Sequence, residues 1–192
     1  SLPLLASLLL PLIGAIGTVL ARRHPNLREG VTLATAALLF ACVWQLAGPV
    51  MAGLRPELTL VEPLPGMPVG FRVEPLGMLF SLVASGLWIV NSVYSIGYMR
   101  GNREQHQTRF YLCFALSIAA ALAIAFAANL LTLFLFYEVL TLVTYPLVTH
   151  AGTDKARKAG RVYLGILMGT SVLFLLPAVI YTAFVAGTTD FR

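Results

Sequence analysis

Charged residues are scarce in this chain, and acidic residues are especially few. Only 11% of the residues are Asp, Glu, Lys or Arg, with eight acidic against thirteen basic side chains. By contrast, 58% are hydrophobic and the mean hydropathy is +0.84. A soluble domain carries about twice that share of charge. The composition therefore excludes an ordinary soluble domain and predicts a membrane protein.

Several other signals are missing. The two cysteines, Cys42 and Cys113, each lie inside an apolar run, which excludes a secreted-type disulfide framework. The basic residues form no stripe interleaved with aromatics, so we expect no nucleic-acid partner. The sequence has no nucleotide-binding glycine loop, metal-ligand cluster or nucleophile arrangement. We therefore expect no catalytic site, metal or cofactor in this chain, and any redox cofactor would belong to a partner.

Apolar runs long enough to cross a bilayer dominate what is present. Each run is bounded by charge or by Gly and Pro. The first lacks a basic region before it and is followed by Arg22 and Arg23, so we interpret it as a span rather than a signal peptide. The sequence predicts a single all-α membrane domain, a bundle of six transmembrane helices at about 2–21, 31–51, 75–98, 110–127, 129–149 and 162–186.

The loops predict an orientation, because short cytoplasmic loops collect Lys and Arg. With the N-terminus outside, three basic residues lie in outside segments and ten in inside loops. The three outside residues are Arg55, Arg72 and Arg192; the ten inside are Arg22, Arg23, Arg28, Arg100, Arg103, Arg109, Lys155, Arg157, Lys158 and Arg161.

The outside segment at 52–74 differs from the other loops. It is rich in proline and contains three glutamates, and the alternation in LTLVE and GFRVE is consistent with a short hairpin. We expect this segment to cap the outer mouth of the bundle.

Glu138 is the one acidic residue deep inside a predicted span. It lies nine residues after Asn129, about 13.5 Å at the α-helical rise. Half of the hydrocarbon core is roughly 15 Å, so Glu138 is close to the bilayer midplane. No Lys or Arg lies within a predicted span to neutralise it. A carboxylate at this depth costs about 2.5–3.5 kcal/mol, which favours a proton or ion relay over a protonated structural carboxyl.

Thr141 and Tyr145 follow Glu138 at helical spacing and share its face. Pro146 removes an amide donor near them, so these groups are candidates for a short water chain. The alternatives are that the two side chains only make packing hydrogen bonds and that Pro146 only kinks the helix. His150 ends the span and is either a further relay group or an interfacial residue.

The last span carries signals of packing rather than of chemistry. Gly165 and Gly169 have the spacing that lets helices approach closely in lipid. Pro177 lies at mid-span and predicts a kink.

Several strings in the second half of the chain resemble a known family. They are LLTLFLFYEVLTLVTYPLVTH, KARKAGRVYLGILMGTS and GTTDF, preceded by FRVEPLGMLFSLV and YSIGYM. From about Phe71 to Arg192 the chain resembles the antiporter-like subunits shared by Mrp-type multisubunit cation/proton antiporters, respiratory complex I and membrane-bound hydrogenases. Tyr137 stands where the family more often has Trp before the key Glu, which resembles the D-type antiporter branch as much as complex I. The resemblance also implies a bacterial inner (plasma) membrane, crossed several times.

The resemblance implies a fold and a role. Family members have roughly fourteen helices in two inverted repeats with broken helices at their centres. Glu138 matches the fifth-helix glutamate of the first half-channel, which pairs with a lysine on a later helix. We therefore expect the chain to correspond to part of the first repeat, with the paired lysine beyond it.

The resulting functional prediction is a proton-translocating subunit of a multisubunit cation/proton antiporter. Its expected partners are other membrane subunits, the lipid bilayer, protons and, as a further candidate, sodium. The alternative is a proton-pumping subunit of a complex I or hydrogenase-type complex, in which case the assembly is an oxidoreductase. An alternative of another class is a non-conducting membrane anchor.

Overall fold

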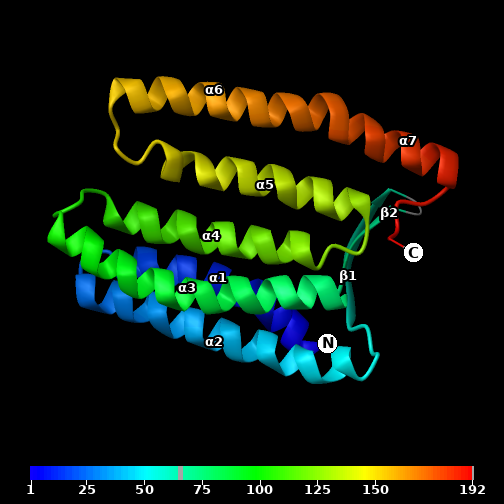
Figure 1. Cartoon of the computed structure of the whole chain (residues 1–192), viewed down its shortest axis with the longest axis horizontal. Helices are drawn as coiled ribbons and strands as arrows, with labels where there is room; N and C mark the ends of the chain where they lie inside the picture. The colour runs from blue at the N-terminus through cyan, green and yellow to red at the C-terminus, as the bar shows by residue number, and fades with distance from the viewer. Residues whose placement is uncertain (65–66, 192) are drawn as a thin grey trace.

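A computed structural model describes residues 1–64 and 67–191 as a bundle of long helices with a small hairpin across one end (Figure 1). The all-α membrane bundle predicted from the sequence is confirmed, since six helices in the described chain are long and apolar enough to cross a membrane. Pro65, Gly66 and Arg192, which entered the loop analysis above, lie outside the described residues. In order the elements are α1 (Leu2–Leu20), α2 (Pro25–Met51), β1 (Glu57–Leu64), β2 (Met67–Arg72), α3 (Pro75–Gly101), α4 (Gln107–Ala125), α5 (Leu130–Val148), α6 (Asp154–Thr170), the π-helical turn η1 (Ser171–Leu175) and α7 (Leu176–Ala186).

Proline and glycine set many of the helix ends. Pro25 and Pro75 open α2 and α3, where the missing N–H of proline would have had no partner in any case. Gly152 follows α5 with a φ of 68° and Gly187 follows α7 with a φ of 69°, a conformation that residues with a Cβ rarely adopt.

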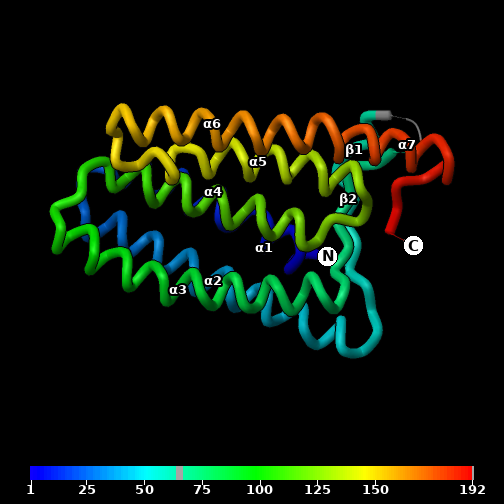
Figure 2. Tube along the Cα trace, turned by 45° about the horizontal axis from the view of Figure 1, so that its top comes forward, coloured from blue at the N-terminus to red at the C-terminus, as the bar shows by residue number. Residues whose placement is uncertain are grey.

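The helices form two unequal groups. α4 packs against α1, α3 and α5, and α2 packs between α1 and α3. This group contains the core, which includes Leu39, Val43, Trp88, Leu122 and Phe126. α6, η1 and α7 form one continuous rod that packs along the far side of α5, as the tube in Figure 2 also shows. Much of the apolar surface of this rod is exposed, which suits contact with lipid or another subunit.

Four helices, α2, α3, α4 and α6, extend beyond the apolar runs that located them. The last predicted span began at residue 162, whereas α6 begins at Asp154 and its first turns carry exposed basic residues. In the same way α2 begins at Pro25 and α3 continues to Gly101. Hydropathy marks only the part of a helix that suits hydrocarbon, while the backbone hydrogen bonds continue into the polar region.

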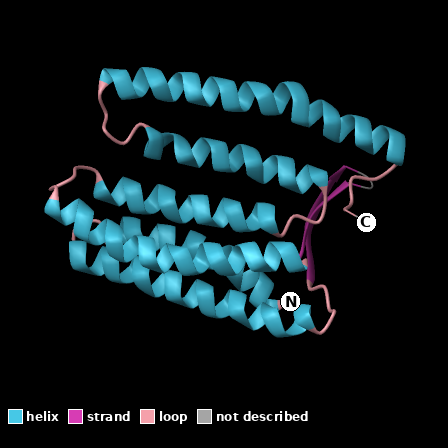
Figure 3. Ribbon diagram, in the orientation of Figure 1, coloured by secondary structure: helices cyan, strands magenta, loops and turns pink. Residues whose placement is uncertain are grey.

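β1 and β2 form the antiparallel hairpin expected in the segment after α2, with Glu57 opposite Arg72 and Leu58 opposite Phe71. Figure 3 shows the hairpin at the end of the bundle where α3 and α5 begin. Arg72 donates its backbone N–H to the Phe126 carbonyl at 2.7 Å, and Ala128 donates to the Gly70 carbonyl at 3.0 Å. The hairpin is therefore hydrogen-bonded to the short link between α4 and α5.

Candidate functional site

The start of α5 is fixed by two fully buried polar residues. The Asn129 side-chain oxygen accepts the N–H of Thr132 at 2.8 Å, which caps the helix. The amide of the same side chain donates to the Pro68 carbonyl at 2.7 Å, and the Thr132 hydroxyl accepts the N–H of Gly70 at 3.0 Å. The helix that carries Glu138 is thus anchored on β2. This anchor was not predicted from the sequence, although an asparagine just before an apolar helix is a recognisable N-cap signal.

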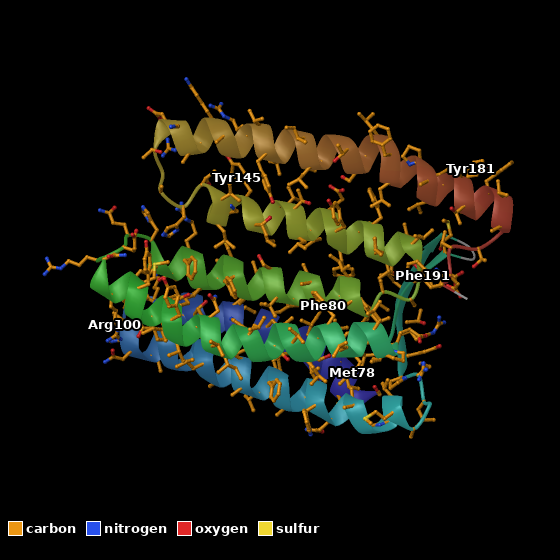
Figure 4. All side chains as sticks on the ribbon, in the orientation of Figure 1. Met78, Phe80, Arg100, Tyr145, Tyr181 and Phe191 are labelled. Atoms are coloured by element: carbon orange, nitrogen blue, oxygen red, sulfur yellow. The ribbon has the colours of Figure 1, made fainter. Side chains whose placement is uncertain are left out.

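The face of α5 that carries Glu138 points toward α6. Tyr145 lies two turns along this face from Glu138. A Cβ built on Gly160 of α6 would lie 3.1 Å from Tyr145 Cε2 and 2.2 Å from Thr149 Cγ2. Figure 4 shows Tyr145 on the side of α5 that faces α6. Glu138 therefore lies on the side of α5 away from α4, between the main bundle and the rod formed by α6, η1 and α7.

The Glu138 carboxyl is buried without a partner in the described part of the chain. Both of its oxygens are inaccessible to solvent, and neither has a hydrogen bond there. No Lys or Arg of residues 1–64 or 67–191 forms an ion pair with it. Burying an unpaired carboxyl is costly, and an intramembrane ionisable residue of this kind is a functional-site candidate by default.

The structure gives Thr141 and Tyr145 different surroundings. Thr141 is 5% exposed and donates its hydroxyl to the Tyr137 carbonyl one turn earlier, at 3.1 Å. That hydroxyl proton is already engaged, so Thr141 can act toward a further group only as a hydrogen-bond acceptor. Tyr145 packs its ring edge at Gly160. Both residues share the Glu138 face, and a relay role for either one stays a prediction.

The two prolines predicted as kinks occupy different settings. Pro146 lies in the last turn of α5, which continues to Val148. Pro177 opens α7 directly after the π-helical turn η1, and α7 slopes away from the line of α6 in Figure 1. A π-helical turn is itself a common cause of a bend. The change of direction in this rod therefore has two local causes, one of which the sequence analysis missed.

Gly165 and Gly169 have no atom within 4 Å of a built Cβ. The predicted close approach is therefore not made inside the described chain, and a contact with another subunit stays a prediction. The glycine of this helix that does allow close approach is Gly160, five residues earlier. Its contact with α5 depends on which helices are neighbours, which the spacing of glycines alone does not reveal.

His150 lies beyond α5, at the opposite end of the bundle from the hairpin. Arg109 donates to its backbone carbonyl at 3.2 Å, and the Phe110 ring packs edge-on at 5.8 Å. Both ring nitrogens are buried without partners among the described residues. Burial, followed by the positive charge of Arg109, lowers the pKa of His150. The imidazole is neutral near pH 7, and twelve residues of mainly helical chain, about 18 Å, separate it from Glu138.

The same end of the bundle contains an ionic cluster around two buried residues, which was not predicted from the sequence. We placed Arg28 in a loop, but Arg28 and Glu29 lie in α2 and are each 5% exposed. Glu29 pairs with Arg100 of α3 at 2.5 Å and lies 3.6 Å from Arg28. The guanidinium of Arg28 also stands 5.2 Å from the centre of the Tyr111 ring. This cluster joins α2, α3 and α4 and requires the three-dimensional fold to be recognised.

No group of three or more His, Cys, Asp or Glu residues in the described chain is placed to hold a metal ion. Cys42 and Cys113 are both free thiols. The distinctive chemical feature of the membrane region is thus the single buried carboxyl on α5.

Comparison with known proteins identifies two family models. Residues 66–111 match the N-terminal region of chain 5 of NADH-ubiquinone oxidoreductase (complex I), and residues 127–192 match the transmembrane region of NADH:quinone oxidoreductases and Mrp antiporters. The second match contains all of α5 with Glu138, and the rod formed by α6, η1 and α7.

Individual relatives come from both branches of this group. The chain is 28% identical over 150 residues to the Na(+)/H(+) antiporter subunit A1 of Staphylococcus aureus, covering 77% of this chain and 18% of the relative. It is 29% identical over 115 residues to NAD(P)H-quinone oxidoreductase subunit 5 of Paulinella chromatophora, covering 55% of this chain and 17% of the relative. The chain thus spans less than a fifth of the length of these relatives. The Mrp-type relative named here is an A subunit, whereas a D-type subunit was expected within the Mrp group.

Solved structures show the same fold. The Mrp complex from Dietzia sp. DQ12-45-1b contains a chain that matches with a TM-score of 0.79 and 23% identity, covering 99% of this chain and 20% of that one. The membrane-bound sulfane sulfur reductase, an archaeal respiratory membrane complex, contains a chain that matches with a TM-score of 0.78 and 19% identity, covering 96% and 28%. These likenesses show the fold alone. On the family-model matches at 66–111 and 127–192, the chain belongs to the antiporter-like subunit family shared by NADH:quinone oxidoreductases and Mrp antiporters, and the partial coverage fits an N-terminal part.

Proposed function

We propose that this chain forms part of a proton path in a multisubunit cation/proton antiporter, with Glu138 as the group that takes up and releases the proton. The observation that carries the proposal is the Glu138 carboxyl, whose two oxygens are buried without a partner in the described residues. An ionisable side chain is costly to bury in a membrane span, and it is retained there mainly where it takes part in transport. The A1-subunit relatives of S. aureus carry the name of a Na(+)/H(+) antiporter, which supports antiport over other roles.

The geometry supports a path that runs between α5 and the rod formed by α6, η1 and α7. Glu138, Thr141 and Tyr145 share the face of α5 that meets this rod, and Ser171 of η1 is buried. A π-helical turn leaves backbone groups outside the regular α-helical pattern, and such turns are frequent at functional sites. A cation that pairs with Glu138 would come from a segment beyond this chain or from a neighbouring subunit.

A test of the antiport proposal uses the complete assembly in inverted membrane vesicles. Addition of sodium should move protons, as reported by a pH-sensitive dye, in vesicles with the unchanged chain. The Glu138→Gln variant should lose that signal. Glu62→Gln, a change at an exposed glutamate of the hairpin, is the matched control and should keep it.

A respiratory proton pump is the second candidate. The match to complex I chain 5 and the likeness to a respiratory membrane complex favour it. In that case proton movement should follow oxidation of a reduced substrate rather than a sodium gradient. The third possibility, a non-conducting anchor, predicts that Glu138→Gln leaves every form of proton movement unchanged.

We also propose a bacterial inner membrane, by analogy with the Staphylococcus aureus relatives. The ten-to-three distribution of basic residues supports an orientation with the hairpin outside. In a Cys-free background, a cysteine at Gln105 should react with a reagent added from the cytoplasm and one at Leu60 with a reagent added from outside. The reverse pattern would contradict this orientation.

A further inference from the structure

A basic pocket opens at the end of the bundle opposite the hairpin, between the α1–α2 turn and the start of α4. It has a volume of about 640 Å³. Three arginines line it, Arg22, Arg28 and Arg109, against one acidic residue, Glu104. The lining is therefore positively charged and suited to an anion.

Arg28, the buried arginine of this pocket, has one side-chain nitrogen without a hydrogen-bond partner among the described residues. Arg28 is 5% exposed, and its two terminal nitrogens donate to Thr108 at 3.2 Å and to Gln107 at 2.7 Å. Its Nε has no hydrogen-bond partner among the described residues, and the same is true of Arg109 Nε. Glu29, the nearest carboxylate, is bonded more closely to Arg100. The buried Arg28 and the half-buried Arg109 thus each have a buried Nε–H without a partner among the described residues, beside the same pocket.

The backbone adds further donors. α4 begins at Gln107, and its N-cap residue, His106, has a left-handed conformation and makes no side-chain cap. The first N–H groups of a helix lack partners within the helix, and the helix dipole makes that end attractive to anions. The first residues of α4 also line the pocket.

The pocket has an apolar side as well. Val19, Pro25 and Leu112 line it, and Val19 belongs to α1, whose surface is largely apolar. A ligand that is anionic at one end and apolar at the other fits both parts. Basic pockets between transmembrane helices near the cytoplasmic surface are suited to anionic lipid headgroups.

From these features we infer that this pocket binds the phosphate group of an anionic phospholipid. The phosphate lies among Arg22, Arg28 and Arg109 at the start of α4, and the acyl chains follow the apolar surface of α1. Such a lipid would join the α1–α2 turn to α4 beside the buried Arg28–Glu29–Arg100 cluster.

The test uses the complete assembly in detergent and a photoreactive phosphatidylglycerol. Cross-linked peptides should come from 19–28 and 104–112. Unlabelled phosphatidylglycerol should compete, whereas phosphatidylcholine and inorganic phosphate should not. Arg22→Gln should weaken labelling of these peptides roughly five-fold, as expected for one basic residue near an anionic headgroup.

Arg22→Lys is the rescue variant and should restore most of the labelling, because the charge returns. Arg23→Gln, a change at the neighbouring exposed arginine that does not line the pocket, is the matched control and should label like the unchanged chain. Equal loss in both Gln variants would overturn the inference, because a diffuse surface charge would then explain the labelling. Competition by inorganic phosphate as strong as by the lipid would assign the pocket to a soluble anion instead.

Discussion

Replacement of Gly77 by alanine is expected to loosen the hairpin end of the bundle. Gly77 lies in the first turn of α3, where a Cβ would stand 2.1 Å from the Ala125 carbonyl oxygen and 3.1 Å from its carbon. These are backbone atoms at the end of α4, so they cannot rotate away as a flexible side chain would. The next residue, Phe126, is fully buried and accepts the hydrogen bond that holds Arg72 of β2. The strain therefore falls on the junction between α3, α4 and the hairpin.

The size of the effect follows from two opposing contributions. Inserting a methyl group into a packed contact typically costs about 1–3 kcal/mol, while exchanging glycine for alanine within a helix gains about 0.5–1 kcal/mol. The clash should dominate at Gly77. Gly97 lies in the same helix with no atom within 4 Å of a built Cβ, so Gly97→Ala should be neutral or slightly stabilising.

Thermal unfolding followed by circular dichroism in detergent compares the two variants directly. We expect a lower midpoint for Gly77→Ala and an unchanged or higher midpoint for Gly97→Ala. Equal midpoints would refute the reasoning, because they would mean that α3 does not approach α4 this closely.

Two further changes test the end of the bundle opposite the hairpin. Glu29→Gln leaves the buried Arg28 without its carboxylate, whereas the half-exposed Arg100 can turn to solvent, so the change should cost at most about 3 kcal/mol, seen as a lower yield of folded protein. Glu74→Gln, at an ion pair exposed on both sides, should cost about 0–1 kcal/mol, and similar yields for the two variants would contradict the assignment. Because burial lowers the pKa of His150, the unfolded chain binds a proton below about pH 6.5 that the folded chain does not, so stability is present at neutral pH and is lost as the pH falls. His150→Asn should flatten the pH dependence of the unfolding midpoint between about pH 7 and about pH 5, and an unchanged pH dependence would contradict this role of His150.

Much of the fold could be predicted because the bilayer imposes a simple rule on the sequence. A helix that crosses hydrocarbon needs a long apolar run, so the runs locate the helices. The rule fails where a helix leaves the hydrocarbon, which is why α6 begins eight residues before the predicted span and why Arg28 is helical and buried. A charged residue near a helix end is interpreted as a loop residue until its partner on another helix is known.

The candidate site likewise has one residue that could be found from the sequence and others that could not. Glu138 could be found from sequence because a carboxyl deep in an apolar run is costly wherever its neighbours lie. Asn129 and Thr132, which anchor α5 on the hairpin, depend on contacts with Pro68 and Gly70 some sixty residues earlier in the chain. The π-helical turn before Pro177 likewise has no simple sequence signal. Long-range hydrogen bonds and close helix contacts therefore had to come from the three-dimensional structure.

Proton flux in vesicles that contain Glu138 variants measures whether protons pass through the Glu138 carboxyl. Glu138→Gln preserves size and hydrogen-bonding capacity but removes the titratable proton, so flux per assembled complex should fall to background. Glu138→Asp keeps the carboxyl but withdraws it by one methylene and should retain partial flux. Flux in the Gln variant equal to that of the unchanged chain, at equal abundance, would contradict the account and leave Glu138 as a structural carboxyl.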